Sequence, residues 1–356
     1  MMRLLLSFLL GLALAGPAMA QTWPVAEGDH VIPDFAFSNG ETLPELRMHY
    51  RTLGEPRRDA EGRIVNAVMV LHGTGGSGAQ FLQPHFADEL YGPGQPLDVA
   101  RYFIILPDNI GHGASSKPSD GLRAAFPEYG YADMVEAQRR LLVEGLGVDR
   151  LRLMMGTSMG CMHIFVWAEA HPDFADALMP LACQPTEIAG RNRLWRAMLM
   201  DAIRSDPAWM GGDYETQPVE GLRTAADLLM LAGAAPMQMQ EMLPTREATD
   251  AWLAEQLPRR IAALDANDLW YQVNASHDYD PSVNLEAIIA PMTWVNSADD
   301  FINPPELGLA EQFIPRIPDV RYVLIPASAE TRGHGTHTWA RFWEDELVAL
   351  LARTEP

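Results

Sequence analysis

Short apolar segments recur along this 356-residue chain, and helical stretches separate several of them. Each segment is continuously apolar, which is typical of strands buried on both faces of a parallel sheet. These segments are 68–71, 103–106, 151–155, 177–181, 292–295 and 322–325. The helical stretches are 132–146, 159–170, 305–313 and 337–351. The alternation predicts an α/β fold with right-handed crossovers between parallel strands.

Two regions depart from this alternation. Residues 31–53 contain two strand-like runs joined at Asn39-Gly40, a dipeptide typical of tight hairpin turns. Residues 184–290 contain no convincing buried strand and are rich in Trp, Met and Arg. We therefore expect a helical lid, inserted into a core of residues 21–183 and 291–356 and placed over the strand ends where ligands bind. An ordinary helical subdomain with its own small core is the alternative.

The N-terminus has the pattern of a secretory signal peptide. Arg3 precedes an apolar run over 4–15, and Ala18-Met19-Ala20 has the small-x-small form of a cleavage site before Gln21. The run is too short to span a membrane comfortably, and no cysteine follows the cleavage site for a lipid anchor. We therefore expect residues 1–20 to be removed and the mature chain to be periplasmic or secreted, without a membrane anchor.

Charge excludes two classes of partner. The formal net charge is −21, which repels both nucleic acid and anionic membrane surfaces.

The two cysteines, Cys161 and Cys183, lie just after one predicted strand and at the end of the next. Export permits a disulfide between them, but bridging geometry is strict. The sequence leaves the pairing open and favours two buried, unreactive thiols.

A serine lies where a strand is predicted to turn into a helix. Gly156-Thr157-Ser158-Met159-Gly160 follows the apolar segment 151–155 and has the G-x-S-x-G form of a nucleophile elbow, a strained turn that exposes a serine hydroxyl. Alone the motif is weak, and a Gly-rich turn with a capping serine is the alternative. A catalytic role for Ser158 requires a base, an acid and an oxyanion hole elsewhere in the chain.

In this class of fold the acid and then the histidine follow the serine along the chain. Asp299 and Asp300 both follow the segment 292–295. Asp300 is favoured as the acid because Pro304, four residues later, completes the D-x-x-x-P pattern that is usual for this turn. His334 is flanked by glycines in the loop after the last apolar segment, which suits an exposed base.

His337 is the alternative base and is expected to open the final helix. The pair could instead chelate a metal, but no third ligand is apparent. We therefore predict His334 as the base and no metal site.

Two backbone amides are candidates for the oxyanion hole. One is that of Met159, the residue after the nucleophile, and the other is that of Thr74 in the Gly-rich loop 72–78. That loop carries neither the G-K-[ST] nor the G-x-G-x-x-G pattern of phosphate-binding loops, so we predict no nucleotide and no other cofactor. The loop histidine, His72, and His112 in a later loop are interpreted as structural.

Taken together these motifs resemble the α/β-hydrolase superfamily, over nearly all of the predicted mature chain. Within it the chain is most similar to homoserine O-acetyltransferase-like proteins. The matching stretches are the G-x-S-M-G elbow, the D-P-x-W-x-G-G-x-Y pattern within 196–214, the D-A-N-x-x-x-Y pattern at 265–271 and the D-x-D at 278–280. Asp300 with Pro304, and Gly333-His334, match the acid and base motifs.

The resemblance implies an α/β-hydrolase fold, a mostly parallel central sheet with an inserted helical lid. It also implies a covalent mechanism on a small ester or thioester substrate, in which Ser158 attacks, His334 acts as base and then acid, and Asp300 orients the imidazole. Family transferases use acetyl-CoA and homoserine. A homodimer is a further implication.

Departures from the family shift the prediction towards a hydrolase. Cys161 replaces the usual second glycine after Ser-Met-Gly, and the stretch after Gly221-Leu222 lacks the A-R and T-Y-R-S pieces of homoserine acetyltransferases. Export also separates the chain from cytosolic acetyl-CoA. We predict an esterase-like serine hydrolase, with an O-acyltransferase and a non-catalytic binding protein as alternatives.

Aromatic and methionine side chains of the expected lid could line an acyl pocket. We favour packing within the lid for each of them. They are Trp195, Trp209, Trp252, Trp270, Tyr271, Met237, Met239 and Met242.

Overall fold

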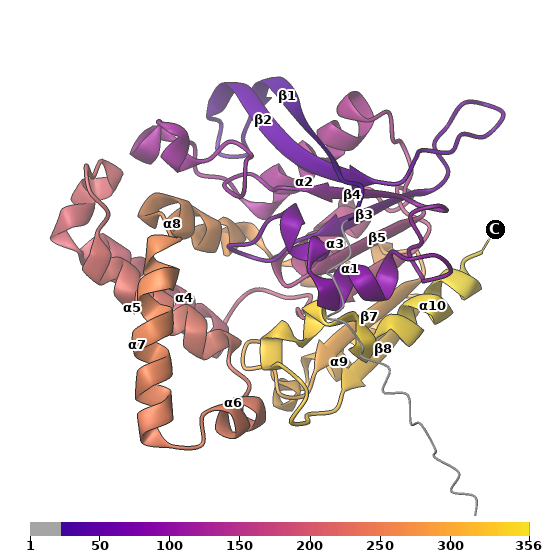
Figure 1. Cartoon of the computed structure of the whole chain (residues 1–356). Coiled ribbons are helices and arrows are strands. Elements are labelled where there is room, and N and C mark those ends of the chain that lie inside the picture. Colours follow the sequence, from indigo (N-terminus) through magenta and orange to yellow (C-terminus); the bar gives the residue numbers. More distant parts are fainter. Residues whose placement is uncertain (1–22, 356) are drawn as a thin grey trace, which may run out of the picture.

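The computed structural model describes residues 23–355, and the predicted signal peptide lies outside them. All strands of the described chain form one sheet in the order β1-β2-β4-β3-β5-β6-β7-β8 (Figure 1). The strands are β1 Ala26–Ala36, β2 Thr42–Leu53, β3 Ala67–Leu71, β4 Phe103–Pro107, β5 Leu153–Thr157, β6 Leu178–Leu181, β7 Met292–Ser297 and β8 Val320–Ile325. β1 and β2 form the predicted hairpin, β2 is antiparallel to β4, and the other neighbours are parallel.

The predicted mostly parallel α/β sheet is therefore confirmed, and every predicted apolar segment overlaps a strand, although β5 and β6 begin later than predicted. Helices cover both faces of the sheet (Figure 1). They are α1 Pro84–Leu90, α2 Tyr131–Arg140, α3 Met159–Ala170, α4 Gly190–Ser205, α5 Val219–Gly233, α6 Pro236–Met242, α7 Arg246–Ala262, α8 Ala266–Asn274, α9 Leu309–Phe313 and α10 Glu344–Arg353.

Alternate residues of each central strand point to opposite sides of the sheet and enter two separate cores. On β3, Met69 and Leu71 pack with α2, α3 and α9, whereas Val68 and Val70 pack with α1 and α10. This two-sided burial explains why the central strands are continuously apolar. β8 is the exception, because it is an edge strand and most of its side chains keep partial exposure.

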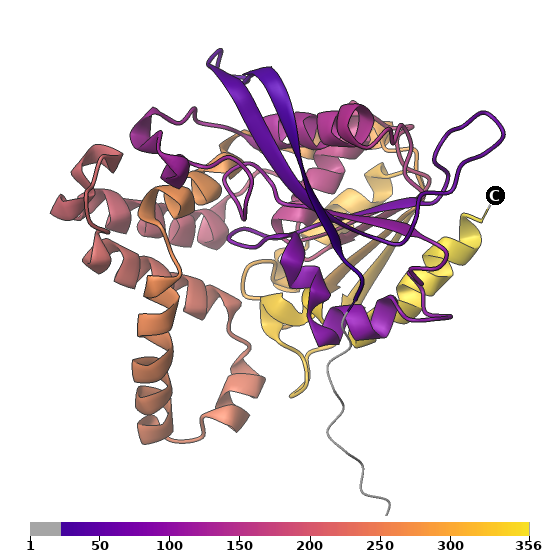
Figure 2. The same cartoon turned by 45° about the horizontal axis from the view of Figure 1, so that its top comes forward.

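The segment between β6 and β7 contains α4 to α8, which extend to one side of the sheet in both views (Figures 1 and 2). It has its own apolar cluster, which includes Trp195, Leu199 and Leu222. Asp268 of α8 joins the inserted segment to the loop after β4. Its carboxylate accepts hydrogen bonds from the backbone N–H and the hydroxyl of Ser119, at 2.9 and 2.6 Å. Burial raises the pKa of Asp268 to about 6.

Two helix predictions are wrong in extent. The helix expected at 337–351 is α10, Glu344–Arg353, preceded by 3₁₀ turns at Gly333–Thr338 and Ala340–Phe342, so His337 does not open it. Acidic residues in the first turn of α10 favour its start at Glu344, because they lie near the positive end of the helix dipole. The helix expected at 305–313 is also shorter than predicted. It is α9, Leu309–Phe313, which is preceded by a 3₁₀ turn and by Gly308 in the left-handed conformation.

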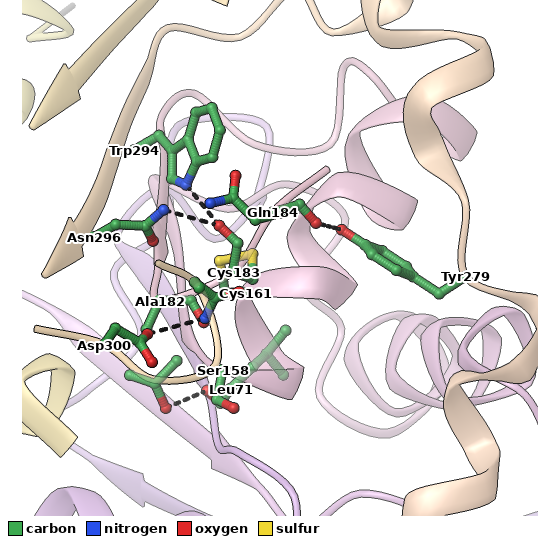
Figure 3. The surroundings of a disulfide bond; sticks show 12 residues. Leu71, Ser158, Cys161, Ala182, Cys183, Gln184, Tyr279, Trp294, Asn296 and Asp300 are labelled. Atoms are coloured by element: carbon green, nitrogen blue, oxygen red, sulfur yellow. Dashed lines mark hydrogen bonds between the residues drawn. A yellow bond between two sulfur atoms is a disulfide. The ribbon is translucent and has the colours of Figure 1, made fainter. Parts of the chain in front are cut away.

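The prediction of two free thiols is also wrong. Cys161 and Cys183 form a disulfide with a Cα–Cα distance of 5.8 Å. Parallel pairing of β5 with β6 places the start of α3 beside the end of β6, which brings the two cysteines within bridging range. Figure 3 shows the bond close to Ser158 and Asp300.

Loss of this disulfide is expected to destabilise the fold. The bond spans 22 residues, for which chain-entropy arguments give about 3 kcal/mol. The double variant Cys161→Ala/Cys183→Ala should therefore unfold at a lower denaturant concentration than the parent, in chemical denaturation followed by tryptophan fluorescence. Dithiothreitol should lower the midpoint of the parent by a similar amount and leave that of the double variant unchanged. Equal midpoints for parent and double variant would contradict this expectation.

Candidate active site

Ser158 lies in a sharp turn between β5 and α3, with φ 54° and ψ −111°. Positive φ is costly for a residue other than glycine and recurs at functional sites. The neighbouring glycines are required by space, since a Cβ on Gly156 would lie 2.4 Å from the carbonyl oxygen of Gly160, and one on Gly160 would lie 2.2 Å from that of Leu71. The Ser158 N–H donates to Leu181 O at 2.8 Å, which fixes the turn against β6.

Histidine and aspartate complete a hydrogen-bonded chain with this serine. Ser158 Oγ lies 2.8 Å from His334 Nε2, and His334 Nδ1 lies 2.8 Å from Asp300 Oδ2. Asp300 follows β7 and His334 lies in a 3₁₀ turn after β8, so two neighbouring parallel strands bring the acid and the base together. In this arrangement the imidazole can take the hydroxyl proton while the carboxylate stabilises the resulting charge.

Asp300 is held in its ionised form. Burial opposes its ionisation, but the nearby His334, together with hydrogen bonds from His334, Asn303 and the Ile302 N–H, lowers the pKa of the carboxyl below its ordinary value. Asn303 Nδ2 donates to Asp300 Oδ2 and also to Ala182 O, both at 3.0 Å. Asn303 was not predicted from the sequence, where its only signal is its place between Asp300 and Pro304.

The two alternative residues have different surroundings. Asp299 accepts hydrogen bonds from Ser297 Oγ at 2.6 Å, Thr331 Oγ1 at 2.7 Å and the Gly333 N–H at 3.2 Å, and thereby ties the β7 end to the His334 loop. The ring of His337 packs edge-on against that of His334, with centroids 5.1 Å apart. Burial lowers the pKa of His337 to about 3, so it stays neutral.

The two candidate oxyanion amides belong to Met159, which follows Ser158, and to Thr74, which follows Gly73. Gly73 packs so closely that a Cβ there would lie 3.1 Å from Ser158 Cβ, which brings the following residue, Thr74, to the site. His72 holds this loop: its Nε2 accepts from the Asn109 N–H at 3.0 Å, and its Nδ1 donates to Gly73 O at 2.8 Å. Among the described residues, neither the Met159 nor the Thr74 N–H has a hydrogen-bond acceptor.

A cavity of about 1180 Å³ opens beside Ser158 and His334. Its walls come from the segment after β6, from α4, from the α5–α6 connection and from the loop after β7. Of the lid side chains considered above for an acyl pocket, Met239 alone lines the cavity. Trp195, Trp209 and Trp270 pack in the apolar cluster of the inserted segment, as favoured from the sequence.

Comparison with known proteins identifies the family. The family described as "alpha/beta hydrolase fold" matches residues 66–330. The chain belongs to the α/β-hydrolase fold family. A probable acyltransferase of Methanothermobacter thermautotrophicus is 31% identical over 288 residues, 80% of this chain and 86% of that protein. A homoserine O-acetyltransferase of Geotalea daltonii is 35% identical over 307 residues, 76% of this chain and 82% of that protein.

Solved structures share the fold of this α/β hydrolase. An acetylester hydrolase from Corynebacterium glutamicum superposes with a TM-score of 0.79 at 22% identity, covering 92% of this chain and 96% of the other. The family and its relatives make the chain a homoserine O-acetyltransferase-like enzyme, a hydrolase or acyltransferase of the α/β-hydrolase type.

Other classes of site are not evident in this α/β hydrolase. Within residues 23–355, no group of three or more His, Cys, Asp or Glu side chains could hold a metal ion. In the same range, no helix is both long and apolar enough to cross a membrane.

The two adjacent aspartates should differ sharply in their effect on activity. Asp300→Asn removes the carboxylate that faces the imidazole and is expected to lower kcat by about 10⁴-fold, whereas Asp299→Asn alters only the support of the His334 loop and should cost far less. Ester hydrolysis by both purified variants, with thermal melting as the folding control, measures the difference. A larger loss for Asp299→Asn would reverse the assignment of the acid.

Proposed function

We propose that this chain is an exported serine ester hydrolase that works through an acyl-enzyme on Ser158. The observation that carries the proposal is the continuous hydrogen-bonded chain from Ser158 Oγ through His334 to Asp300, with both distances at 2.8 Å, beside a cavity of about 1180 Å³. Ligand cavities for small molecules are of about this size. We propose a small or medium ester as the substrate class, which a cavity of this volume can hold.

The geometry supports a two-step reaction. Ser158 Oγ attacks the ester carbonyl as His334 Nε2 takes its proton, and the oxyanion accepts hydrogen bonds from the Met159 and Thr74 amides. The intermediate collapses, His334 returns the proton to the leaving alcohol, and the acyl group stays on Ser158. Water, deprotonated by His334, then attacks the acyl-enzyme and releases the carboxylic acid.

An O-acyltransferase is the second candidate, and the names of the curated relatives favour it. The chemistry differs only in the last step, in which an alcohol replaces water as the acceptor. Two sequence features favour water: Cys161 in place of a second glycine after the elbow, and the missing A-R and T-Y-R-S pieces.

Export is part of the proposal and rests on the signal-peptide pattern of residues 1–20. The disulfide between Cys161 and Cys183 supports it, because disulfides persist in oxidising compartments.

We also propose a homodimer, for which apolar side chains exposed on the inserted helices offer a surface. Examples are Leu194, Met198 and Val219, which are 59%, 50% and 46% exposed.

Mass spectrometry of the intact protein tests the mechanism. Incubation with a short-chain ester should add the acyl mass to wild type, and the mass should be lost in water within the turnover time. Ser158→Ala should gain no mass and should lose almost all esterase activity, at least 10³-fold. Acetyl-CoA offered with homoserine should give no acetylated product. An acyl-enzyme that is stable in water but discharged by an added alcohol would instead establish the transferase.

The export proposal predicts the mature N-terminus. Expression of the full chain in a Gram-negative host should yield a periplasmic protein whose intact mass begins at Gln21. A cytoplasmic protein that retains Met1 to Ala20 would contradict it. A Ser158→Ala variant should be processed identically, since cleavage does not depend on catalysis.

A further inference from the structure

An arginine of the inserted segment is buried in the wall of the active-site cavity. Arg196 lies on α4 and is only 2% exposed, yet it lines the same cavity as Ser158 and His334. Arginine is almost never fully buried unless it is paired with an acid. The contacts of its guanidinium therefore decide whether the charge is already neutralised by the protein.

The protein supplies Arg196 with neutral partners only. Nε donates to Asn192 Oδ1 at 3.0 Å and Nη1 donates weakly to Ser276 Oγ at 3.4 Å. The hydroxyl of Tyr131 is a further neutral neighbour of the guanidinium, and Nη2 has no geometrically defined hydrogen bond within the described residues. The guanidinium also lies 4.9 Å from the ring centroid of Trp195. Within residues 23–355, no Asp or Glu carboxylate lies within 4 Å of it, so its charge lacks a counter-ion.

The acidic residues around the cavity do not fill this role. Asp300 is engaged by His334, and Asp299 by Ser297 and Thr331. Glu187 and Glu306 line the cavity but are exposed, and neither forms an ion pair within the described chain. Burying an unpaired charge costs free energy of desolvation. An anion that entered the cavity and paired with Arg196 would offset part of that cost.

A second polar residue of the cavity wall also has a side-chain atom without a hydrogen bond. Gln184 follows the disulfide-bonded Cys183, and both residues line the cavity. The Gln184 backbone carbonyl accepts from Tyr279 Oη at 2.8 Å (Figure 3), but its side-chain Oε1 is buried with no hydrogen bond in the described structure. The unpartnered Gln184 oxygen is an acceptor and suits an O–H or N–H of a ligand, so the preference for an anion in this mostly apolar cavity rests on Arg196 alone.

We propose that this cavity binds an ester that also carries a free carboxylate, and that Arg196 receives the carboxylate while Ser158 attacks the ester carbonyl. The inference deepens the proposed esterase function and rests on it. The carboxylate accepts hydrogen bonds from Nη2 and Nη1 and is unchanged by the reaction, in which ester and water give acid and alcohol. Arg196 is not the arginine of the missing A-R piece, which would follow Gly221-Leu222 on α5.

Paired substrates test this subsite. On the acyl side, mono-4-nitrophenyl adipate is compared with 4-nitrophenyl hexanoate, so that a carboxylate replaces a methyl group. On the alcohol side, 4-acetoxybenzoate is compared with 4-methylphenyl acetate. Wild type should show at least a tenfold higher kcat/KM for the anionic member of one pair, which also identifies the side of the ester that carries the charge.

Arg196→Met should remove that preference. The ratio of kcat/KM values, anionic over neutral, is expected to fall by about 10- to 100-fold, while the neutral ester is hydrolysed within a few-fold of wild type. Arg204→Met is the matched control, because Arg204 is an exposed arginine of the same helix that does not line the cavity. Its ratio should equal that of wild type.

Three outcomes separate the proposals. Wild type that hydrolyses the neutral esters without an anionic preference overturns the carboxylate subsite and leaves the esterase function standing. A preference that survives Arg196→Met overturns the role of Arg196. Wild type that hydrolyses none of the esters overturns the esterase function itself. If Arg196→Met does not fold, Arg196→Lys and the wild-type ratio decide, because a retained charge should keep part of the preference.

Discussion

The close packing of the nucleophile turn is the constraint on which the rest of the site depends. Gly156 and Gly160 leave no room for a Cβ, and the carbonyl oxygen of Leu71 would lie 2.2 Å from a Cβ on Gly160. β3, β5 and α3 are therefore held in contact, and Ser158 is forced to a positive φ of 54°. The strain is sustained because the surrounding strands are buried on both faces and have no freedom to relax.

Neighbouring elements meet this turn through short polar links rather than through apolar packing alone. Asn303 joins Asp300 to Ala182 O, while Asp299 fastens the loop that carries His334. The disulfide lies in the same region and connects α3 to the segment that forms the cavity wall. Each link restricts one of the three loops that must converge, which is how a site built on loops attains fixed distances.

The arrangement of Ser158, His334 and Asp300 does not by itself separate an ester hydrolase from an acyltransferase. A serine, a histidine and an aspartate in one hydrogen-bonded chain serve hydrolysis and acyl transfer equally well, since both begin with an acyl-enzyme. The distinction lies in what the cavity admits next to Ser158. Arg196 and Gln184 line the cavity from the inserted segment and from its approach, so we propose that this region of the chain sets specificity, whereas the reactive residues follow strands of the sheet.

The sequence by itself determined the mostly parallel sheet, the strand–helix order and a short set of candidate residues, because apolar runs are local patterns and several motifs in the right chain order support one another. It predicted Ser158 and favoured Asp300 and His334, but it could not pair the cysteines or place the start of the last helix. The tertiary structure decided the pairing, because it depends on how the start of α3 lies beside the end of β6. It also showed that 3₁₀ turns precede the last helix, which the apolar pattern does not distinguish from the helix itself. The same holds for Arg196, an ordinary helical arginine in the sequence, whose burial without an acid arises only when α4 packs against the cavity.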